Sequence, residues 1–251
     1  MVQLLKLGVR GPEVARLQNA LNAKLMPSPR LVPDGVFGGL TDGAVRRFQQ
    51  ANWLVVDGQA GQCTQACAFD LESEPPILHA IRLQPQPTQT TCWAASTAMM
   101  IGSTPQAVNQ RTPADMKTQD GSLANWSETD QALPRGQAYG RIHGLRCNAP
   151  QSYMIIAIRN MLRRGPVMFD MLWNITEYLT PNAGVPGEFL GSSGHMICVI
   201  GIRGDNDPTG IGTTLRINDP WKPNIGKQYS INYARFITRV PGATYRVFEK
   251  M

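Results

Sequence analysis

Cys92 occupies a position that suits a nucleophile. The polar segment before it gives way to a run of good helix formers that extends to Ile101 and stops at Gly102, so we expect Cys92 at or near a helix N-terminus. Unpaired backbone amides and the helix dipole favour a thiolate there, and the thiolate is the form of cysteine that attacks a carbonyl carbon. A buried structural cysteine is the alternative. The flanking threonines and the helix start favour the nucleophile.

A thiolate nucleophile needs a partner base, and the chain has three histidines, His79, His143 and His195. His79 lies beside a proline-containing segment, and His143 lies in a polar, glycine-flanked stretch. His195 follows a Gly/Ser-rich segment and opens an apolar run over residues 196–202. This pattern predicts that His195 stands at the exposed start of a buried strand, which makes it the preferred base for Cys92.

The base in turn needs an acceptor that orients its ring. Residues 215–219 read as a strand that Pro220 terminates, and both Asn218 and Asp219 lie at its end. Either side chain could accept a hydrogen bond from the imidazole, and Asp219 is our choice. The competing interpretation is an Asx turn that only ends the strand.

The first third of the chain contains an internal repeat that predicts a separate module. Gly8, Gly11, Val14, Leu17 and Leu21 recur 27 residues later as Gly35, Gly38, Thr41, Ala44 and Phe48, and a third, shorter copy contains Gly58, Gly61, Thr64 and Cys67. Each copy has a glycine-containing loop followed by residues at helical spacing. Thr41 and Thr64 are placed where a hydroxyl could cap a helix. We therefore predict a compact module of three helices.

The two halves of the chain meet at a proline-rich segment. Prolines in residues 72–76 disfavour continuation of the preceding helix. We predict a small helical domain over residues 1–71, a linker over residues 72–80 and a second domain over residues 81–251.

Composition and charge limit the classes of function. The net charge of +6 and a pI near 9.2 suit an anionic partner such as a cell envelope. The chain has no block of five basic residues and no apolar run of about 18 residues, so neither nucleic-acid binding nor a membrane span is expected. Its five cysteines are odd in number and form no CxxC pair, which favours reduced thiols and predicts neither a zinc site nor another cofactor. The first residues lack the pattern of a signal peptide, so another delivery route is expected.

The repeat region resembles a known family. Residues 7–18 and 34–49, followed by Asp57 and Gly58, contain Asp-Gly, Phe-Gly, Thr, Ala-Val and Phe-Gln elements in order. They are similar to the peptidoglycan-binding domain 1 family over about residues 3–70. The resemblance implies a helical bundle that docks onto peptidoglycan and has no catalysis of its own. Phe37 and Phe48 are better explained as core residues, so we assign no wall-contacting residue.

The Cys92, His195 and Asp219 set resembles the papain-like cysteine peptidases, and most closely the bacterial branch that includes the AvrRpt2-type proteases. The family places a glutamine six residues before the nucleophile and a tryptophan directly after it, and Gln86 and Trp93 occupy these positions. The order of the three catalytic residues also agrees. The resemblance covers about residues 77–251 and implies an α+β fold, with a helical part that carries the cysteine and an antiparallel sheet that carries the histidine and the aspartate.

Two further features bear on the papain-like resemblance. Trp221 lies two positions beyond Asp219, as a family tryptophan does. The usual Cys-Gly-Ser-Cys-Trp surroundings are replaced by Thr-Thr-Cys-Trp over residues 90–93, so the substrate pockets of the family cannot be transferred. Gln86 is implied to help form the oxyanion hole, and Gln89 is a second possible donor.

The combined resemblances imply an amide hydrolase that acts on the bacterial cell wall. The leading hypothesis is a peptidoglycan amidase or endopeptidase in the periplasm or wall of a target bacterium. It could be delivered as an antibacterial type VI secretion effector, with a cognate immunity protein in the producer, or as a phage-type lysin. The alternatives are a protease that cleaves proteins while tethered to the wall, and a non-catalytic wall-binding protein.

Overall fold

The computed structural model describes residues 2–124, 132–151, 154–173, 193–238 and 245–251. The chain divides into two compact units, each made of several segments. Unit 1 comprises residues 1–76, 203–214 and 230–235, and unit 2 comprises residues 77–202, 215–229 and 236–251. The predicted domain boundaries remain a prediction, and the predicted linker contains strand β1 (Glu74–Leu78).

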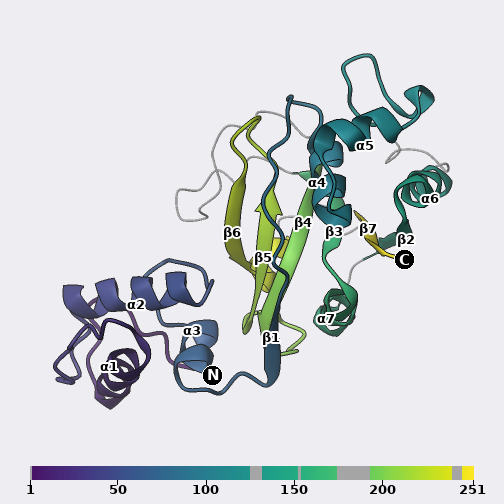
Figure 1. Ribbon diagram of the computed structural model, residues 1–251. Coiled ribbons are helices and arrows are strands. Elements are labelled where there is room, and N and C mark those ends of the chain that lie inside the picture. The colour runs from purple at the N-terminus through teal and green to yellow at the C-terminus, as the bar shows by residue number, and fades with distance from the viewer. Residues whose placement is uncertain (1, 125–131, 152–153, 174–192, 239–244) are drawn as a thin grey trace. The chain divides into compact units, whose positions relative to one another are not determined.

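Unit 1 contains the three helices that the repeat predicts: α1 (Pro12–Lys24), α2 (Gly39–Ala51) and α3 (Gln62–Ala68) (Figure 1). Their apolar faces meet in one core, as the helical spacing requires. Its most deeply buried members are Leu5, Val14, Leu17, Leu21, Phe37, Val45, Phe48, Ala60 and Ala68. Phe37 and Phe48 are therefore core residues, as expected.

The first two helices each use a buried glutamine to hold the loop that follows. Gln18 Nε2 donates to Asp34 Oδ1 (2.9 Å) and Thr41 Oγ1 (3.1 Å), and Gln18 Oε1 accepts from Gly35 N (3.1 Å). Gln49 repeats this pattern one copy later, because its Nε2 donates to Asp57 Oδ1 (2.8 Å) and Thr64 Oγ1 (3.2 Å) and its Oε1 accepts from Gly58 N (2.9 Å). The contacts to Asp34, Gly35 and Thr41 therefore recur 23 residues later at Asp57, Gly58 and Thr64, although the glutamines that make them are 31 residues apart.

The proposed capping role of the two threonines was wrong. The N-cap residues of α2 and α3 are Gly38 and Gly61, and neither helix has a side-chain cap. Thr41 and Thr64 lie inside the first turn and are buried, since they face Gln18 and Gln49. The hydroxyls of Thr41 and Thr64 thus accept hydrogen bonds from the side-chain amides of Gln18 and Gln49 and do not cap the first backbone N–H groups of α2 and α3.

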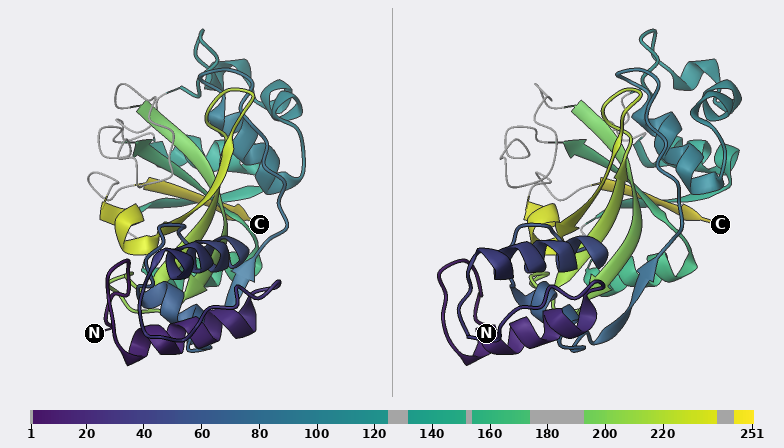
Figure 2. Two further views of the ribbon diagram at one scale, coloured as in Figure 1. Left: turned by 90° about the vertical axis from the view of Figure 1, so that its left-hand side faces the viewer. Right: turned by 60° about the vertical axis from the view of Figure 1, so that its left-hand side comes forward.

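Seven strands among the described residues form one sheet in the order β2-β7-β3-β4-β5-β6, with β1 paired to β4. Besides β1 they are β2 (Leu145–Gln151), β3 (Val167–Trp173), β4 (Ser193–Gly204), β5 (Thr213–Asp219), β6 (Lys227–Asn232) and β7 (Tyr245–Lys250). The β2–β7, β3–β7 and β3–β4 pairs are antiparallel. Figure 2 shows the twist of these strands across one another. The predicted α+β class is confirmed.

Helix α4 (Cys92–Ile101) lies beside the sheet, together with the other helices outside unit 1 (Figure 1). They are α5 (Pro105–Arg111), the 3-10 turn η1 (Ala114–Met116), α6 (Ala132–His143) and α7 (Ile155–Arg164), and the short α9 (Tyr233–Thr238) spans the boundary between the units in sequence. Every α4 residue from Cys92 to Met100 is buried, which explains why the helix is mostly apolar. Its two buried hydroxyls are hydrogen bonded, Ser96 to Met196 O (2.8 Å) and Thr97 to the hydroxyl of Tyr139 (2.7 Å). Alternate residues of β4 (Met196, Cys198 and Ile200) share its core cluster.

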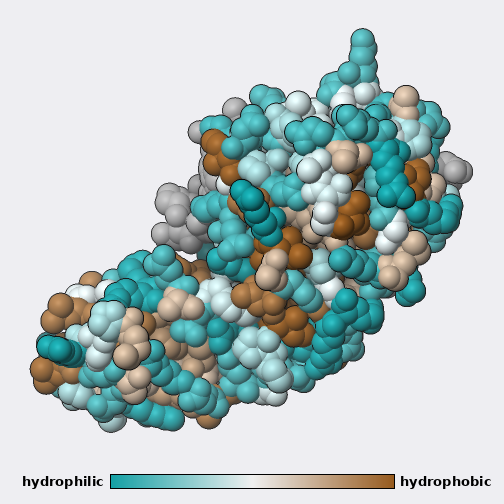
Figure 3. Space-filling view, viewed as in Figure 1, coloured by the Kyte–Doolittle hydropathy of each residue, from teal (hydrophilic) through white to brown (hydrophobic). Residues whose placement is uncertain are grey.

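The face of the molecule in Figure 3 intersperses hydrophilic and hydrophobic residues. Large apolar side chains such as Met26 (87% exposed) and Leu40 (82% exposed) lie on the surface of unit 1. Scattered exposed apolar residues are normal in soluble proteins, so exposure alone assigns no wall-contacting residue.

Candidate active site

Cys92 is the first residue of helix α4, where the sequence placed it. Its exposed fraction is 9%. The backbone turn before it is ordered by Thr91, the N-cap residue, whose Oγ1 accepts a hydrogen bond from Thr88 N (3.0 Å). No side chain caps the helix, so its first backbone N–H groups remain near the sulfur. The end of the helix is equally well defined, because Gly102 adopts the left-handed conformation (φ 69°).

His195 lies near the start of β4, and it is buried rather than exposed. Its exposed fraction is 2%, because its ring is enclosed with Asp219, which is also 2% exposed. The expectation of an exposed strand start was therefore wrong, while the placement on the strand was right. Its Nε2 lies 2.8 Å from Asp219 Oδ1. Cys92 also interacts with the His195 ring.

The pKa of His195 reflects these two neighbours. Burial alone lowers the pKa of the imidazole, but the Asp219 carboxylate and Cys92 outweigh burial and raise it to about 10. The environment thus favours the protonated ring at neutral pH. A protonated imidazole beside a sulfur favours the thiolate in return.

Asp219 is held by three donors. Its Oδ1 accepts from His195 Nε2 and from the backbone N of Trp221 (2.9 Å), and its Oδ2 accepts from the hydroxyl of Tyr229 (3.4 Å). Asn218 faces elsewhere, since its Nδ2 donates to Ile81 O (3.1 Å). Of the two residues that the sequence left open, the structure brings Asp219 to the imidazole.

Gln86 is completely buried in the segment before the nucleophile. Its backbone N donates to Pro220 O (3.0 Å), and its backbone O accepts from Asn224 N (2.9 Å), so the segment is tied to the turn that follows Asp219. Its side-chain Nε2 donates to Thr88 O (2.7 Å), and its Oε1 has no hydrogen-bond partner in the described part of the chain. Gln89, the second possible donor, is exposed.

The other two histidines are occupied away from this set. A ring nitrogen of His79 hydrogen bonds Leu162 O (2.7 Å). His143 is buried, and its Nε2 shares a hydrogen bond with Thr112 Oγ1 (3.0 Å). Burial lowers the pKa of His143 to about 4, with a smaller contribution from the charge of Arg111.

Two supports of the site were not identified from the sequence. Tyr229 on β6 donates its hydroxyl to Asp219 Oδ2. The alternation of buried and partly exposed residues along β6 indicates that Tyr229 is buried but does not indicate this contact. A loop also holds the turn before α4, because Trp93 Nε1 donates to Gly121 O (3.1 Å) and Thr90 Oγ1 donates to Asp120 O (2.8 Å). Trp93 directly follows Cys92, but its hydrogen-bond partner Gly121 is distant in sequence.

The described ranges contain neither a metal-binding cluster nor a helix suited to cross a membrane. No cluster of three or more His, Cys, Asp or Glu residues there could hold a metal ion. No helix there is long and apolar enough to cross a membrane. The five cysteines, all within the described ranges, are free thiols.

Comparison with known families accounts for both parts of the chain. The model of the family described as papain-like cysteine protease AvrRpt2 matches residues 77–238, which is more than half of the chain, so the protein belongs to this family of cysteine peptidases. A second model, described as "Putative peptidoglycan binding domain", matches residues 10–67. The chain is thus a peptidoglycan-binding module fused to a papain-like peptidase domain, as the sequence predicted.

Three solved structures illustrate the range of similar proteins. The SleB N-terminal domain is 35% identical over 27% of this chain and 90% of its own (TM-score 0.26). A protein described as a C39-like peptidase from Bacillus anthracis is 15% identical over 71% of this chain and 99% of its own (TM-score 0.42). The endolysin of the Burkholderia phage AP3 is 20% identical over 77% of this chain and 57% of its own (TM-score 0.26).

Proposed function

We propose that the protein is a peptidoglycan hydrolase that cleaves an amide bond in the stem peptide or at its junction with the sugar. The observation that carries the proposal is the fusion of a papain-like peptidase domain to a peptidoglycan-binding module in one chain. A binding module raises the effective concentration of its linked enzyme at the bound surface. A peptidase linked to a wall-binding module therefore meets wall peptides at far higher concentration than other substrates.

The catalytic steps follow from the arrangement of Cys92, His195 and Asp219. The thiolate of Cys92 attacks the carbonyl carbon, and the amide bond breaks as protonated His195 gives its proton to the leaving amine. Neutral His195 then takes a proton from the water that attacks the thioester, the carbon–sulfur bond breaks to release the carboxylic acid, and the thiolate and the protonated imidazole are restored. Asp219 holds the imidazole in orientation and stabilises its charged form throughout.

The oxyanion of the tetrahedral intermediate needs hydrogen-bond donors. The backbone N–H of Cys92 at the start of α4 is one candidate. Gln86 is the other, because a primary amide nitrogen carries two hydrogens and Thr88 O accepts only one of them. In this role Gln86 acts beside the nucleophile without changing its own protonation.

A protein substrate is the second candidate function. The family description of the peptidase domain names a protease, and the chemistry at Cys92 is the same for any amide. In this case the N-terminal module would keep a protease at the wall.

The biological setting that fits a wall hydrolase is the periplasm or cell wall of a target bacterium. Delivery as a type VI secretion effector or as a phage-type lysin agrees with this setting. An effector of this kind requires an immunity protein in its producer, because the producer has the same wall chemistry.

Targeting the protein to the periplasm of a Gram-negative host tests the proposal. Wild type should cause lysis and change the muropeptide profile of the surviving wall, and Cys92→Ala should do neither. Lysis by wild type with an unchanged muropeptide profile would favour the protein substrate. Equal toxicity of Cys92→Ala and wild type would contradict hydrolysis altogether.

A further inference from the structure

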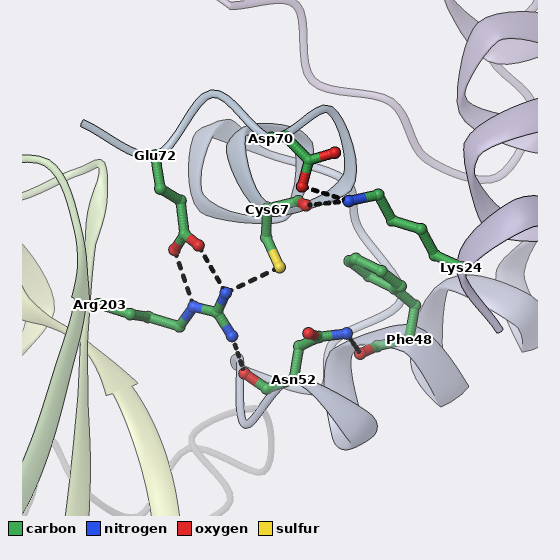
Figure 4. Close-up of polar contacts among 7 residues, drawn as sticks. All are labelled: Lys24, Phe48, Asn52, Cys67, Asp70, Glu72 and Arg203. Atoms are coloured by element: carbon green, nitrogen blue, oxygen red, sulfur yellow. Dashed lines mark hydrogen bonds and ion pairs between the residues drawn. The ribbon is translucent and has the colours of Figure 1, made fainter. Parts of the chain in front are cut away.

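Arg203, near the end of β4, is the centre of a buried polar cluster in unit 1 (Figure 4). Its Nε donates to Glu72 Oε1 (2.8 Å) and its Nη2 donates to Glu72 Oε2 (2.6 Å), so the guanidinium and the carboxylate form a bidentate ion pair. Nη1 donates to the backbone O of Asn52, and Nη2 also contacts Cys67 Sγ (2.9 Å). The same guanidinium lies 5.0 Å from the ring centroid of Trp53. One side chain therefore joins α3, the residues that follow α2 and the residues that follow α3.

The burial of this charge makes the cluster important for stability. The exposed fraction of Arg203 is 5%. Burial on its own lowers the pKa of Arg203, but the hydrogen bonds to Glu72 outweigh burial and raise it. Burial raises the pKa of Cys67 to about 11, so its thiol is neutral at physiological pH. Glu72 is therefore the anion that balances Arg203 in the cluster, and removal of one partner would leave the other charge without its counter-ion.

Further contacts in unit 1 join the same segments of the chain. Gln62 Nε2 donates to Asp205 Oδ2 (2.9 Å), and Cys63 Sγ donates to Ile211 O (3.2 Å). Ser230 Oγ donates to Trp53 O (2.5 Å), and Asn232 Nδ2 donates to Ile211 O (2.7 Å). Gln62 and Cys63 thus contact the segment 203–214, and Trp53 contacts the segment 230–235. The bond between Asn232 and Ile211 joins these two later segments to each other. The contacts recur along both later segments, so the cluster at Arg203 is not an isolated contact.

We propose that residues 203–214 and 230–235 are an integral, stabilising part of the unit that contains the peptidoglycan-binding helices, with Arg203 as the central lock that holds these segments together. Residues 203–214 comprise the end of β4, the connection that follows it and the start of β5. That this unit binds the wall rests on the proposed function, whereas its assembly does not.

Variants of the full-length chain test the lock. Arg203→Met removes the buried cation and leaves the partly buried Glu72 without its counter-ion, so the midpoint of thermal unfolding should fall by about 10 °C. Glu72→Gln is a milder variant that keeps the shape of the side chain and should cause a smaller fall in the same direction. Asp42→Asn is the control, because it breaks the ion pair with Arg46 on the surface of α2 in the same unit. Its midpoint should change by no more than about 2 °C.

Hydrogen exchange read by mass spectrometry distinguishes a lock from a local contact. In Arg203→Met or Glu72→Gln, backbone amides of residues 203–214 and of α3 should lose protection together, while the control retains both. The proposal is overturned if residues 203–214 lose protection while α3 stays fully protected, or if both lock variants unfold at the wild-type temperature. Absence of sacculus binding by wild type would contradict the proposed function and leave this measurement unaffected.

Discussion

His195 Nε2 and Asp219 Oδ1 lie 2.8 Å apart in a buried pair, and the carboxylate favours the protonated form of the imidazole. One ring nitrogen is engaged by the carboxylate, and Cys92 interacts with the same ring. A carboxylate at this position does more than orient the ring, since its charge also raises the pKa of His195. Replacing Asp219 by Asn tests the effect of the carboxylate charge on the His195 ring.

Asp219→Asn should lower the pKa of His195, because the amide keeps a hydrogen-bond acceptor but loses the negative charge. The active pair requires a protonated His195, so the alkaline limb of the kcat/KM profile should move to lower pH than in wild type. At neutral pH the loss of one charge-assisted hydrogen bond should cost about 10- to 100-fold in kcat/KM. An alkaline limb at the wild-type position would show that Asp219 does not set the charge of His195.

Gln86→Ala removes the second proposed oxyanion donor. The expected result is a fall in kcat of about 10²–10³-fold, with little change in KM, because the donor acts mainly on the transition state. Gln89→Ala is the matched control, since Gln89 is exposed in the same segment and should leave kcat unchanged. A large effect of Gln89→Ala with a small effect of Gln86→Ala would transfer the role to Gln89.

Tyr229→Phe deletes the hydroxyl that donates to Asp219 Oδ2 and keeps the buried ring. We expect kcat to fall by about three- to tenfold at unchanged KM, which corresponds to the loss of one hydrogen bond. In the double variant with Asp219→Asn, the effect of Tyr229→Phe should largely disappear, because both changes act on the same carboxylate. Additive effects of the two changes would argue against a role for Tyr229 through Asp219.

His143 should make the fold sensitive to acid. The pKa of His143 is about 4 in the folded chain and near 6.5 when unperturbed, so the folded state favours the neutral ring. Its contribution to stability is complete above about pH 6.5 and is lost as the pH falls toward 4, to a total of up to about 3 kcal/mol. His143→Gln keeps a partner for Thr112 but cannot protonate. Thermal unfolding from pH 7 to pH 4 should therefore show a shallower decline in this variant, and an equally steep decline would contradict the assignment.

The sequence predicted the elements better than their side-chain contacts. The three-helix module, the helix that begins at Cys92 and the strand that begins beside His195 follow from local spacing and periodicity, which a single sequence records. Asn218 and Asp219 could not be separated, because adjacent residues at a strand end point to opposite faces and one residue of register exchanges them. The choice depends on where His195 lies, which is a tertiary relationship.

The features that were missed join residues far apart in sequence. Alternation marks Tyr229 as buried but does not reveal that its hydroxyl meets Asp219. Glycine loops and helical spacing located the repeat, but they did not show that Gln18 and Gln49 engage the threonines that we had assigned to capping. Arg203 looks like an ordinary strand residue in the sequence, and its partner Glu72 is 131 positions away.

The most direct test of the account is digestion of purified peptidoglycan sacculi by wild type and by Cys92→Ala, with the soluble products identified by mass spectrometry. Wild type should release new muropeptides, whose masses identify the cleaved amide bond, and Cys92→Ala should release none, although both proteins sediment with the sacculi. Sacculi that bind wild type and stay intact, in a preparation where the same enzyme hydrolyses a protein substrate, would contradict the wall-hydrolase function.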